Sequence, residues 1–408
     1  MKLFEKYKWL LFAVAIMLVS MLYRRPDPFY NAHFWAEEGL VFYSEAFNQG
    51  WSSMFNTCVG YFHLYPRLIA NASVQFGVPL HITPFLYTFS CLVIHFLLLI
   101  YIWKRLPFSE LQRFFIAITI VMIPLQAEVF MNLTNIQWLM VFFPLIIFSQ
   151  NKFSNTPAII TLDSIILVFS AFTGPNFVVL LPLFIALLFV KIKQKPLQMA
   201  SLIALILAVC AGIIGLYYLK LHGSVNRTEG VFVLANKGFI QYLFVQFYYI
   251  VIGKFAYKIP LILMLLGLVL VLIFYAVLIK WLWKSKNRSF EWIVLACNLL
   301  FIGTTLVAYR TEPELLSPYY RGVRNFYIPT VTFVWLFIRY VEDWKFSKLI
   351  VSGLMILFTI ETIVFVGRFR VINAPDLSIY SGKLKVQEEV QVPIFPEGWV
   401  MKLEKENK

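Results

Sequence analysis

A succession of about eleven long apolar stretches, at roughly 20 residues for each membrane crossing, limits what this chain can fold into. Of the 408 residues, 60% are hydrophobic and 14% are charged, whereas soluble domains carry about 25% charged residues. In hydrocarbon an α-helix is stable because it satisfies its own backbone hydrogen bonds. The pattern predicts an all-α polytopic membrane protein with about 11 transmembrane helices. The stretches cover 9–23, 80–103, 114–127, 136–149, 158–172, 175–190, 197–219, 259–279, 291–309, 326–338 and 349–366.

The basic residues predict how these helices are oriented. Nearly half of the 35 Lys and Arg residues lie in six short connections that alternate along the chain. Short loops rich in Lys and Arg stay in the cytoplasm. We therefore expect a cytoplasmic N-terminus and an extracytoplasmic C-terminus, with a transmembrane domain over 1–366 and a small outer tail over 367–408. Large outer loops are expected at 24–79, 220–258 and 310–325, and they would contain interfacial helices. One of these helices would lie in the outer interface over 239–258, because four polar side chains dilute its apolar character.

Several function classes are disfavoured. The net charge of +14 suggests nucleic acid, but the basic residues flank apolar segments, where they set topology, so we expect no nucleic-acid partner. The four cysteines are scattered and indicate neither disulfides nor a metal cluster. The chain has no phosphate-binding glycine loop and no HExxH motif, so it does not use nucleotide as a cytoplasmic cofactor.

The first outer loop contains "NAHFWAEEGLVFYSEAFNQG" at 31–50, with two adjacent acids among aromatic residues. Drawn as a helix, it places Glu37 and Glu38 on a polar side opposite Trp35 and Leu40, which predicts an amphipathic helix along the membrane surface. In one interpretation the acids are simply its water-facing side. In the other, they line a cavity roofed by aromatic groups, where burial raises the pKa of a carboxyl and makes it a better base.

Downstream, "GYFHLYPRLIA" at 60–70 contains Tyr61, His63 and Arg67. These side chains could form a cationic, aromatic-lined edge, with Arg67 holding a phosphate and Tyr61 and His63 contacting a sugar. The alternative is an interfacial aromatic belt with an arginine that extends its charge to water.

The turn "LQAEVFMNLTNIQW" at 125–138 concentrates polar groups between two apolar stretches. Glu128, Asn132 and Asn135 could bind sugar hydroxyls or a divalent cation, and oxygen ligands suit Mg²⁺ or Mn²⁺. The metal requirement stays open, because one carboxylate is a small ligand set. Asn135 could instead cap the next helix.

A third polar segment, "YRTEPELLSPYYRGVRNFYIP" at 309–329, contains Arg310, Arg321 and Arg324 on the outer side, with Tyr320 beside them. Arginine binds phosphate through two parallel hydrogen bonds. The alternative is salt bridges to Glu312 and Glu314. Asp163 and Glu361 lie within apolar stretches and are functional candidates by default, although Asp163 is close enough to the interface to reach it.

Two further segments predict local structure. "FTGPNF" at 172–177 is typical of a tight turn. "VQEEVQVPIFPEGWVMKL" near the C-terminus alternates polar and apolar residues, which indicates one or two short strands in a cap on the outer loops.

These segments together resemble the GT-C membrane glycosyltransferases. More narrowly, "FWAEEGLVFYSEAF", "GYFHLYPRL", "EVFMNLTNIQW", "FTGPNF", "RGVRNFYIP" and "VPIFPEGWVMKL" resemble bacterial polytopic proteins with an AEDG-like motif, over nearly the whole chain. This chain has Ala36-Glu37-Glu38-Gly39 at the position of that motif.

The resemblance implies a GT-C-like helix bundle in the bacterial inner membrane. The enzyme would transfer a sugar from a polyprenyl-phosphate donor to a cell-envelope glycan, lipid or protein on the extracytoplasmic face. Glu37 or Glu38 would match the first-loop catalytic acid and Glu128 the second acid. Arg321 and Arg324 would match the phosphate site by location. The membrane lipids and the glycan or lipid acceptor would be its partners.

Two other functions remain open at this stage. A transporter or flippase of lipid-linked glycan should show a polar path at mid-membrane and related halves, and the sequence shows few mid-span charges and no repeat. A non-catalytic membrane protein of envelope assembly would not need Glu37 and Glu38.

The topology can be tested with reporter fusions. A fusion after residue 50 should place alkaline phosphatase outside, where it is active, and a matched fusion after residue 108 should leave it inactive. Cytoplasmic location of the first fusion would contradict the orientation, because donor chemistry at the outer face requires that loop outside.

Overall fold

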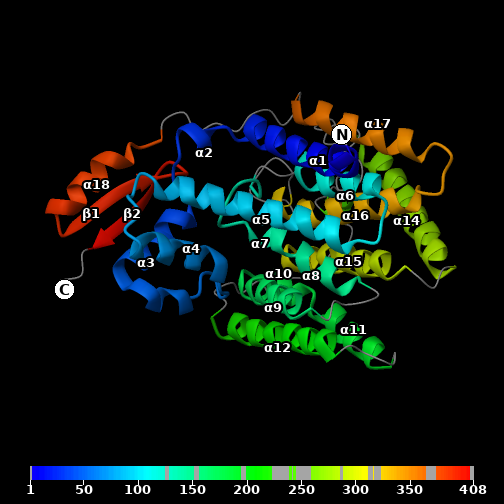
Figure 1. Cartoon of the computed structure of the whole chain (residues 1–408), viewed down its shortest axis with the longest axis horizontal. Coiled ribbons are helices and arrows are strands. Elements are labelled where there is room, and N and C mark those ends of the chain that lie inside the picture. Colours follow the sequence, from blue (N-terminus) through cyan, green and yellow to red (C-terminus); the bar gives the residue numbers. More distant parts are fainter. Residues whose placement is uncertain are drawn as a thin grey trace.

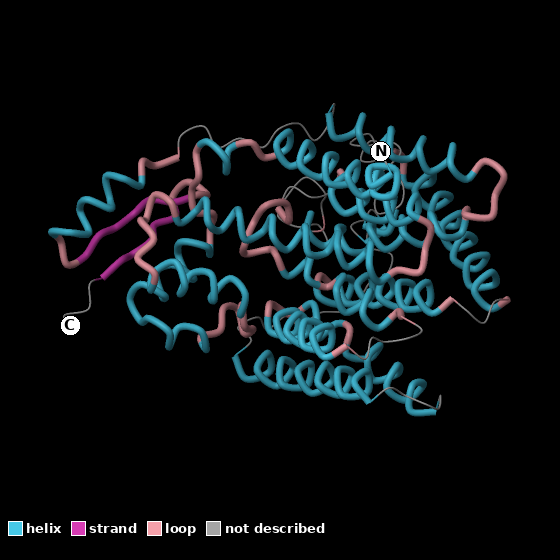
Figure 2. The backbone as a smooth tube through the Cα atoms, viewed as in Figure 1, coloured by secondary structure: helices cyan, strands magenta, loops and turns pink. Residues whose placement is uncertain are grey.

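The structure is a computed structural model, and helices dominate it (Figures 1 and 2). Most of the long helices run along the longest axis of the molecule, with the N-terminus toward one end and the C-terminus at the other. It describes residues 2–124, 128–150, 156–193, 199–222, 239–240, 242–244, 259–284, 288–310, 316, 323–363 and 374–404.

The first half of the chain builds two long helices, α1 and α5, with shorter elements between and after them. The elements are α1 (Lys2–Arg24), α2 (Asp27–Tyr30), the π-helix η1 (Glu38–Tyr43), α3 (Ser44–Gln49), the 3-10 helix η2 (Gly50–Phe55), α4 (Leu64–Gln75), α5 (Thr83–Arg105), α6 (Glu110–Met122), α7 (Gln137–Met140), α8 (Phe142–Phe148) and α9 (Pro157–Phe172).

The second half completes the bundle and ends in a hairpin. The elements are α10 (Asn176–Val179), α11 (Leu181–Lys193), α12 (Met199–His222), α14 (Leu261–Trp283), α15 (Ser289–Ala308), the 3-10 helix η5 (Val323–Phe326), α16 (Tyr327–Tyr340), α17 (Ser347–Glu361), α18 (Leu377–Val386), β1 (Glu389–Ile394) and β2 (Trp399–Glu404).

Each predicted apolar stretch falls on a helix, as the hydropathy pattern required. Within the described ranges, four helices are long and apolar enough to cross a membrane: Tyr7–Arg24, Thr83–Arg105, Leu261–Trp283 and Ser289–Ala308. In α14, large apolar side chains such as Ile262 and Leu272 are exposed. Such a surface is unfavourable in water and suits contact with hydrocarbon.

Other predicted stretches are shorter or broken in the structure. The stretch 136–149 is divided into α7 and α8, and 175–190 into α10 and α11, while α6 already ends at Met122. Every side chain of α8 is buried, and this helix contacts α5, α9 and α15. Such a segment is apolar because it lies in the protein core, and hydropathy alone cannot separate that case from contact with lipid. The part of 239–258 that bears on the interfacial helix lies mostly outside the described residues.

The contact between the C-terminal ends of α1 and α6 shows how a charged side chain satisfies the last carbonyls of a helix. Arg24 donates from Nη1 to the Val121 carbonyl at 2.9 Å and from Nη2 to the carbonyls of Ile123 and Pro124 at 2.9 and 3.1 Å. The last carbonyls of a helix have no partner within it. A buried guanidinium satisfies them here and fixes α1 to α6.

The acid loop, residues 31–49, differs from the predicted amphipathic helix. Residues 31–37 are largely irregular, η1 is a π-helix, and only α3 is α-helical. Glu38, predicted on the polar side, is only 5% exposed, whereas Leu40 on the opposite side is 40% exposed. The wider turns of a π-helix rotate successive side chains less than an α-helix does. The interpretation of Glu38 as part of a water-facing side is therefore wrong.

The C-terminal cap, residues 374–404, confirms the strands expected from alternation. β1 and β2 pair antiparallel, from Glu389 opposite Glu404 to Ile394 opposite Trp399. Val392 and Met401 are buried, whereas Gln391 and Val400 on the other face are exposed. The hairpin is therefore an exception to the predicted all-α fold. It lies beside α18 and the acid loop at the C-terminal end of the molecule (Figure 1).

The "FTGPNF" segment is a turn, but it also fastens the loop before α4. Gly174 donates its amide to the Phe62 carbonyl at 2.7 Å, and the Thr173 hydroxyl accepts the Tyr65 amide at 3.1 Å. Gly174 has φ +92°, and a Cβ at this position would overlap the carboxamide of Gln137. A glycine is required here by both backbone and space.

Gly174→Ala should destabilise the protein more than Gly77→Ala. Gly77 has φ +64° and no neighbour within 4 Å of a built Cβ, so only backbone strain of about 1 kcal/mol applies there. Gly174→Ala adds overpacking of about 1–3 kcal/mol. Thermal unfolding in detergent should show the lower midpoint for Gly174→Ala, and equal midpoints would contradict the close approach to Gln137.

Candidate functional site

The Glu38 carboxylate joins two segments that are far apart in the sequence. Its Oε2 accepts the Trp35 amide at 3.0 Å, and its Oε1 accepts the Leu133 amide at 2.7 Å. Backbone amides buried away from water need such an acceptor. Glu38 therefore fixes the acid loop onto the turn that contains Glu128, Asn132 and Asn135.

Burial raises the pKa of Glu38 to about 7. The hydrogen bonds from the Trp35 and Leu133 amides and the charge of Arg25 act in the opposite direction, but the loss of hydration is the larger effect. The sequence-based expectation of a desolvated acid in this loop is therefore confirmed for Glu38.

A buried ion pair lies at the start of the segment between α1 and α5, and the sequence analysis missed it. Arg25 Nη2 lies 3.5 Å from Asp27 Oδ2, and His33 Nε2 lies 3.7 Å from the same oxygen. Arg25 also donates to the Phe130 carbonyl at 3.1 Å. The adjacent charges of "RRPD" directly after an apolar stretch were a signal for such a buried pair.

The turn at 128–136 is held by its own polar side chains. Asn132 Oδ1 accepts the Asn135 amide at 3.3 Å, and Asn135 Nδ2 donates to the Glu128 carbonyl at 2.8 Å. The next helix, α7, has Ile136 at its N-cap position and no side-chain cap, so the interpretation of Asn135 as its cap is wrong. Both amide side chains are buried, so the Glu128 side chain is the part of this turn that reaches the surface.

Glu128 meets an arginine from the third polar segment. Arg324 Nη1 lies 3.8 Å from Glu128 Oε2, and the two side chains are 42% and 24% exposed. The contact is long and the Arg324 side chain is exposed, although Glu128 Oε2 itself is buried, so an anionic ligand could approach Arg324 without displacing a tight ion pair. Arg324 belongs to η5, directly before α16.

Tyr61 connects this pair to the acid loop. Burial raises the pKa of the Tyr61 hydroxyl to about 12; the charge of Arg324 lowers it, and Cys58, Glu37 and Tyr309 raise it. Arg324 approaches Glu128, and the neighbouring Asn325 donates to the Tyr309 hydroxyl at 3.2 Å. The charges of Arg324 and Glu37 act on the Tyr61 hydroxyl in opposite directions. Glu37, Tyr61, Glu128, Tyr309 and Arg324, which come from four segments of the chain, are thus linked by contacts or by their charges. We call these five residues the charged cluster.

The backbone is strained close to these groups. Ala36, Val59 and Met131 have positive φ angles of 47°, 55° and 51°. This conformation is uncommon outside glycine and costs about 1–3 kcal/mol per residue. Ala36 precedes the two acids, Val59 lies in the turn between Cys58 and Tyr61, and Met131 precedes Asn132. Strain of this kind gathers at functional sites.

Arg67 and His63 lie below the surface. Arg67 is fully buried, and its Nη1 contacts Glu45 Oε2 at 2.7 Å and the Ser53 carbonyl at 2.9 Å. Burial, followed by the charge of Arg67, lowers the pKa of His63 to about 3, so this imidazole is neutral. Its ring packs against Phe42 and Tyr61. Phosphate binding by Arg67 and sugar binding by His63 stay predictions. In the structure, both side chains hold neighbouring segments together inside the protein.

The other predicted residues are not all described. Arg310 donates to the Val307 carbonyl at 3.1 Å at the end of α15. Tyr320, Arg321, Glu312 and Glu314 lie outside the described residues. The roles predicted for them therefore stay predictions.

The two acids within apolar stretches have different surroundings. Asp163 is 7% exposed and accepts hydrogen bonds from Tyr101 and Arg105, both at 2.7 Å, so it is paired within the protein. Glu361 is 5% exposed at the end of α17. Its Oε2 has no hydrogen-bond partner in the part of the chain that the structure describes.

The ligand set does not fit a dedicated divalent metal site. Asn132 and Asn135 use their side chains within the turn, which leaves the Glu128 carboxylate as its charged oxygen ligand. Within the described ranges no group of three or more His, Cys, Asp or Glu side chains could hold a metal ion. Mg²⁺ and Ca²⁺ sites in proteins use several oxygen ligands.

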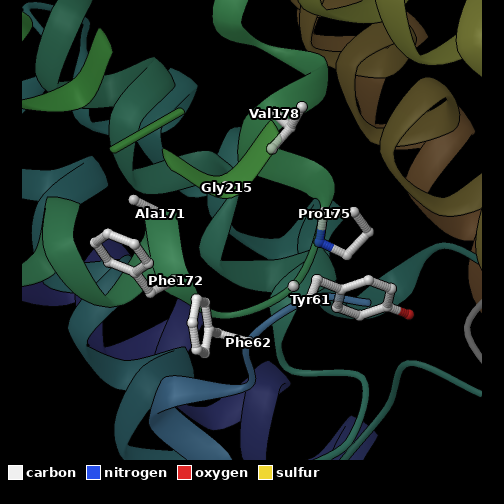
Figure 3. Close-up of a pocket in the computed structure, with 8 residues that line it drawn as sticks. Tyr61, Phe62, Ala171, Phe172, Pro175, Val178 and Gly215 are labelled. Atoms are coloured by element: carbon white, nitrogen blue, oxygen red, sulfur yellow. The ribbon is translucent and has the colours of Figure 1, made fainter. Parts of the chain in front are cut away.

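An apolar pocket adjoins the charged cluster at Tyr61 (Figure 3). The Tyr61 ring lies beside Pro175, and its hydroxyl points away from Phe62 and Phe172. The remaining lining comes from α9, the turn after it, α10 and α12, and Gly215 of α12 approaches Val178 closely. Tyr61 therefore separates an apolar pocket from charged groups.

Comparisons with protein-family models, with curated proteins and with solved structures find no match for this chain.

The buried Glu38 should make stability depend on pH. The pKa of Glu38 in the folded protein, about 7, lies above its ordinary value of 4.5. Between these pH values the folded state therefore binds more protons than the unfolded state. The stabilisation that Glu38 contributes is fully present below about pH 4.5, and about 3 kcal/mol of it is lost as the pH rises through 7.

Glu38→Gln should remove this pH dependence. The variant should also be less stable at pH 5, by about 1–3 kcal/mol, because a carboxamide cannot accept both amide hydrogen bonds. Unfolding midpoints measured between pH 5 and 8 for both proteins test this. Parallel pH profiles would show that Glu38 does not titrate in this range.

Proposed function

We propose that this chain is a glycosyltransferase of the bacterial inner membrane. It would transfer a sugar from a polyprenyl-phosphate donor to a cell-envelope glycan, lipid or protein on the extracytoplasmic face. The observation that supports this most is the charged cluster, in which acids, an arginine and tyrosines from four segments are linked by an ion pair and by their charges beside an apolar pocket. About eleven membrane crossings, including the shorter helices, belong to this proposal.

The proposed donor has two chemically different parts, and the site offers a counterpart for each. The exposed guanidinium of Arg324 suits a phosphate, since arginine binds phosphate through charge-assisted hydrogen bonds. The apolar side chains that line the small pocket next to Tyr61 would contact the first carbons of the hydrocarbon chain. An amphiphilic donor would place its phosphate at the boundary between them.

The two adjacent acids take different parts in this proposal. Glu38 is buried and both of its oxygens accept backbone amides, so it acts as a positioning residue. Glu37 is partly exposed and lies close enough to Tyr61 to influence its hydroxyl. Glu37 is therefore the better candidate for the base.

The reaction would follow from these placements. Glu37 takes the proton of the acceptor hydroxyl while the oxygen of that hydroxyl attacks the sugar C1. The bond between C1 and the phosphate oxygen breaks, and the negative charge on the leaving phosphate is stabilised by Arg324. Attack opposite the leaving group inverts the configuration at C1. Glu128 would orient Arg324 and the acceptor.

The alternatives receive less support. A transporter needs a polar path through the middle of the bundle, whereas α8 in the core reads FFPLIIF, with all of its side chains buried. A non-catalytic assembly protein would not require the acids of the charged cluster.

Replacing the reacting groups should abolish transfer without loss of protein. Glu37→Gln should lower glycan formation by about 10²–10⁴-fold, the usual contribution of a general base, and Glu128→Gln and Arg324→Ala should also lower it. Lipid-linked and surface glycan would be measured in cells that depend on this chain. Glu397→Gln, at an exposed acid in the hairpin turn, is the matched control. Unchanged glycan in all three variants, at normal expression, would refute the catalytic proposal.

A further inference from the structure

The acid loop has a second anchor in addition to Glu38. Phe395, in the turn after β1, donates its amide to the Phe34 carbonyl at 3.2 Å and accepts the Ala36 amide. Trp35 lies between these two contacts and gives its own amide to Glu38. The hairpin turn is therefore one residue away from the backbone amide that holds the buried acid.

Asn48 makes the same connection at the other end of the loop. Its Nδ2 donates to the Lys402 carbonyl at 3.3 Å, and its Oδ1 accepts the Glu404 amide at 2.9 Å. Both partners are backbone groups of β2. One side chain thus pairs with the edge of a strand through both of its amide groups.

Close packing joins the two anchors. A Cβ added to Gly39 would lie 2.9 Å from Ile394 Cδ1 and 3.0 Å from Phe34 Cβ. Ile394 and Gly39 are both buried, so the hairpin approaches the acid loop directly behind Glu38. Apolar contacts as close as these transmit small displacements.

We infer that the C-terminal cap positions the acid loop, with Asn48 and the Phe395 backbone as positioning groups, so that the cap controls the geometry of Glu37, Glu38 and the 128–136 turn. Its consequence for catalysis rests on the proposed function. The connection runs from β2 and the hairpin turn through residues 34–36 to Glu38, and from Glu38 to the Leu133 amide. None of the cap residues needs to touch the substrate.

The coupling can be measured without a substrate. Hydrogen exchange of the detergent-solubilised protein should be compared for Asn48→Ala, for a chain ending at residue 373 and for Lys402→Ala. The Lys402 side chain is about half exposed and pairs with Glu389 and Glu404, whereas Asn48 uses only the backbone of residue 402. Lys402→Ala is therefore the matched control.

Loss of the two Asn48 hydrogen bonds should speed exchange about tenfold in peptides covering 33–42 and 129–136. The truncated chain should show at least the same change. Asn48→Asp, which keeps the acceptor for the Glu404 amide, should be intermediate, and Lys402→Ala should match the unchanged protein.

Faster exchange in 33–42 alone, with 129–136 unchanged, would overturn the inference, and so would equal effects of Asn48→Ala and Lys402→Ala. Glycan formation is then measured in cells. Asn48→Ala should lower it, and variants with a larger increase in the exchange rate of 33–42 and 129–136 should lower it more. Faster exchange with full glycan formation would refute the catalytic part of the inference. If Glu37→Gln and Glu128→Gln leave glycan unchanged, the proposed function fails, while the exchange result still decides whether the cap positions the loop.

Discussion

The arrangement of the acid loop and the 128–136 turn depends on one buried carboxylate that accepts hydrogen bonds from backbone amides of two segments. Glu38 receives the Trp35 and Leu133 amides, which in hydrocarbon or in a dry core would be costly to leave unpaired. Residues 31–36 of the acid loop are irregular, so the Trp35 amide has no partner in a regular helix or strand. A side chain must do so, and that requirement brings the loop onto the 128–136 turn.

Buried charges play the same part elsewhere in the structure. Arg24 completes the C-terminal end of α6, and Arg67 links α4 to Glu45 and to the Ser53 carbonyl. At the far end of α5, Arg105 pairs with Asp163. In each case the charge is removed from water and is stabilised by bonds to backbone or to an opposite charge, which makes the surrounding elements rigid.

This rigidity matters for the proposed reaction. A transferase of this kind has to place a base, an acceptor and a leaving phosphate within a few tenths of an ångström. The charged cluster comes from four segments, and the groups that would react, Glu37 and Arg324, are the more exposed members of their surroundings. The buried residues beside them, such as Glu38 and Arg67, hold the backbone. The acids adjacent in sequence thus have different physical environments, and this separates positioning from chemistry.

The sequence by itself determined where the helices lie, that the C-terminal segment forms strands, and that charged residues concentrate in a few loops, because hydrophobic periodicity and alternation are local properties. It could not separate α8, buried in protein, from a helix facing lipid, since both are apolar. It also could not show that Glu38 faces inward, because the π-helical turn and the hairpin packed on Gly39 decide that. Only the tertiary structure decided which charged groups come near one another. Burial and electrostatic contact depend on residues far apart in the chain, such as Glu37, Tyr61, Glu128 and Arg324.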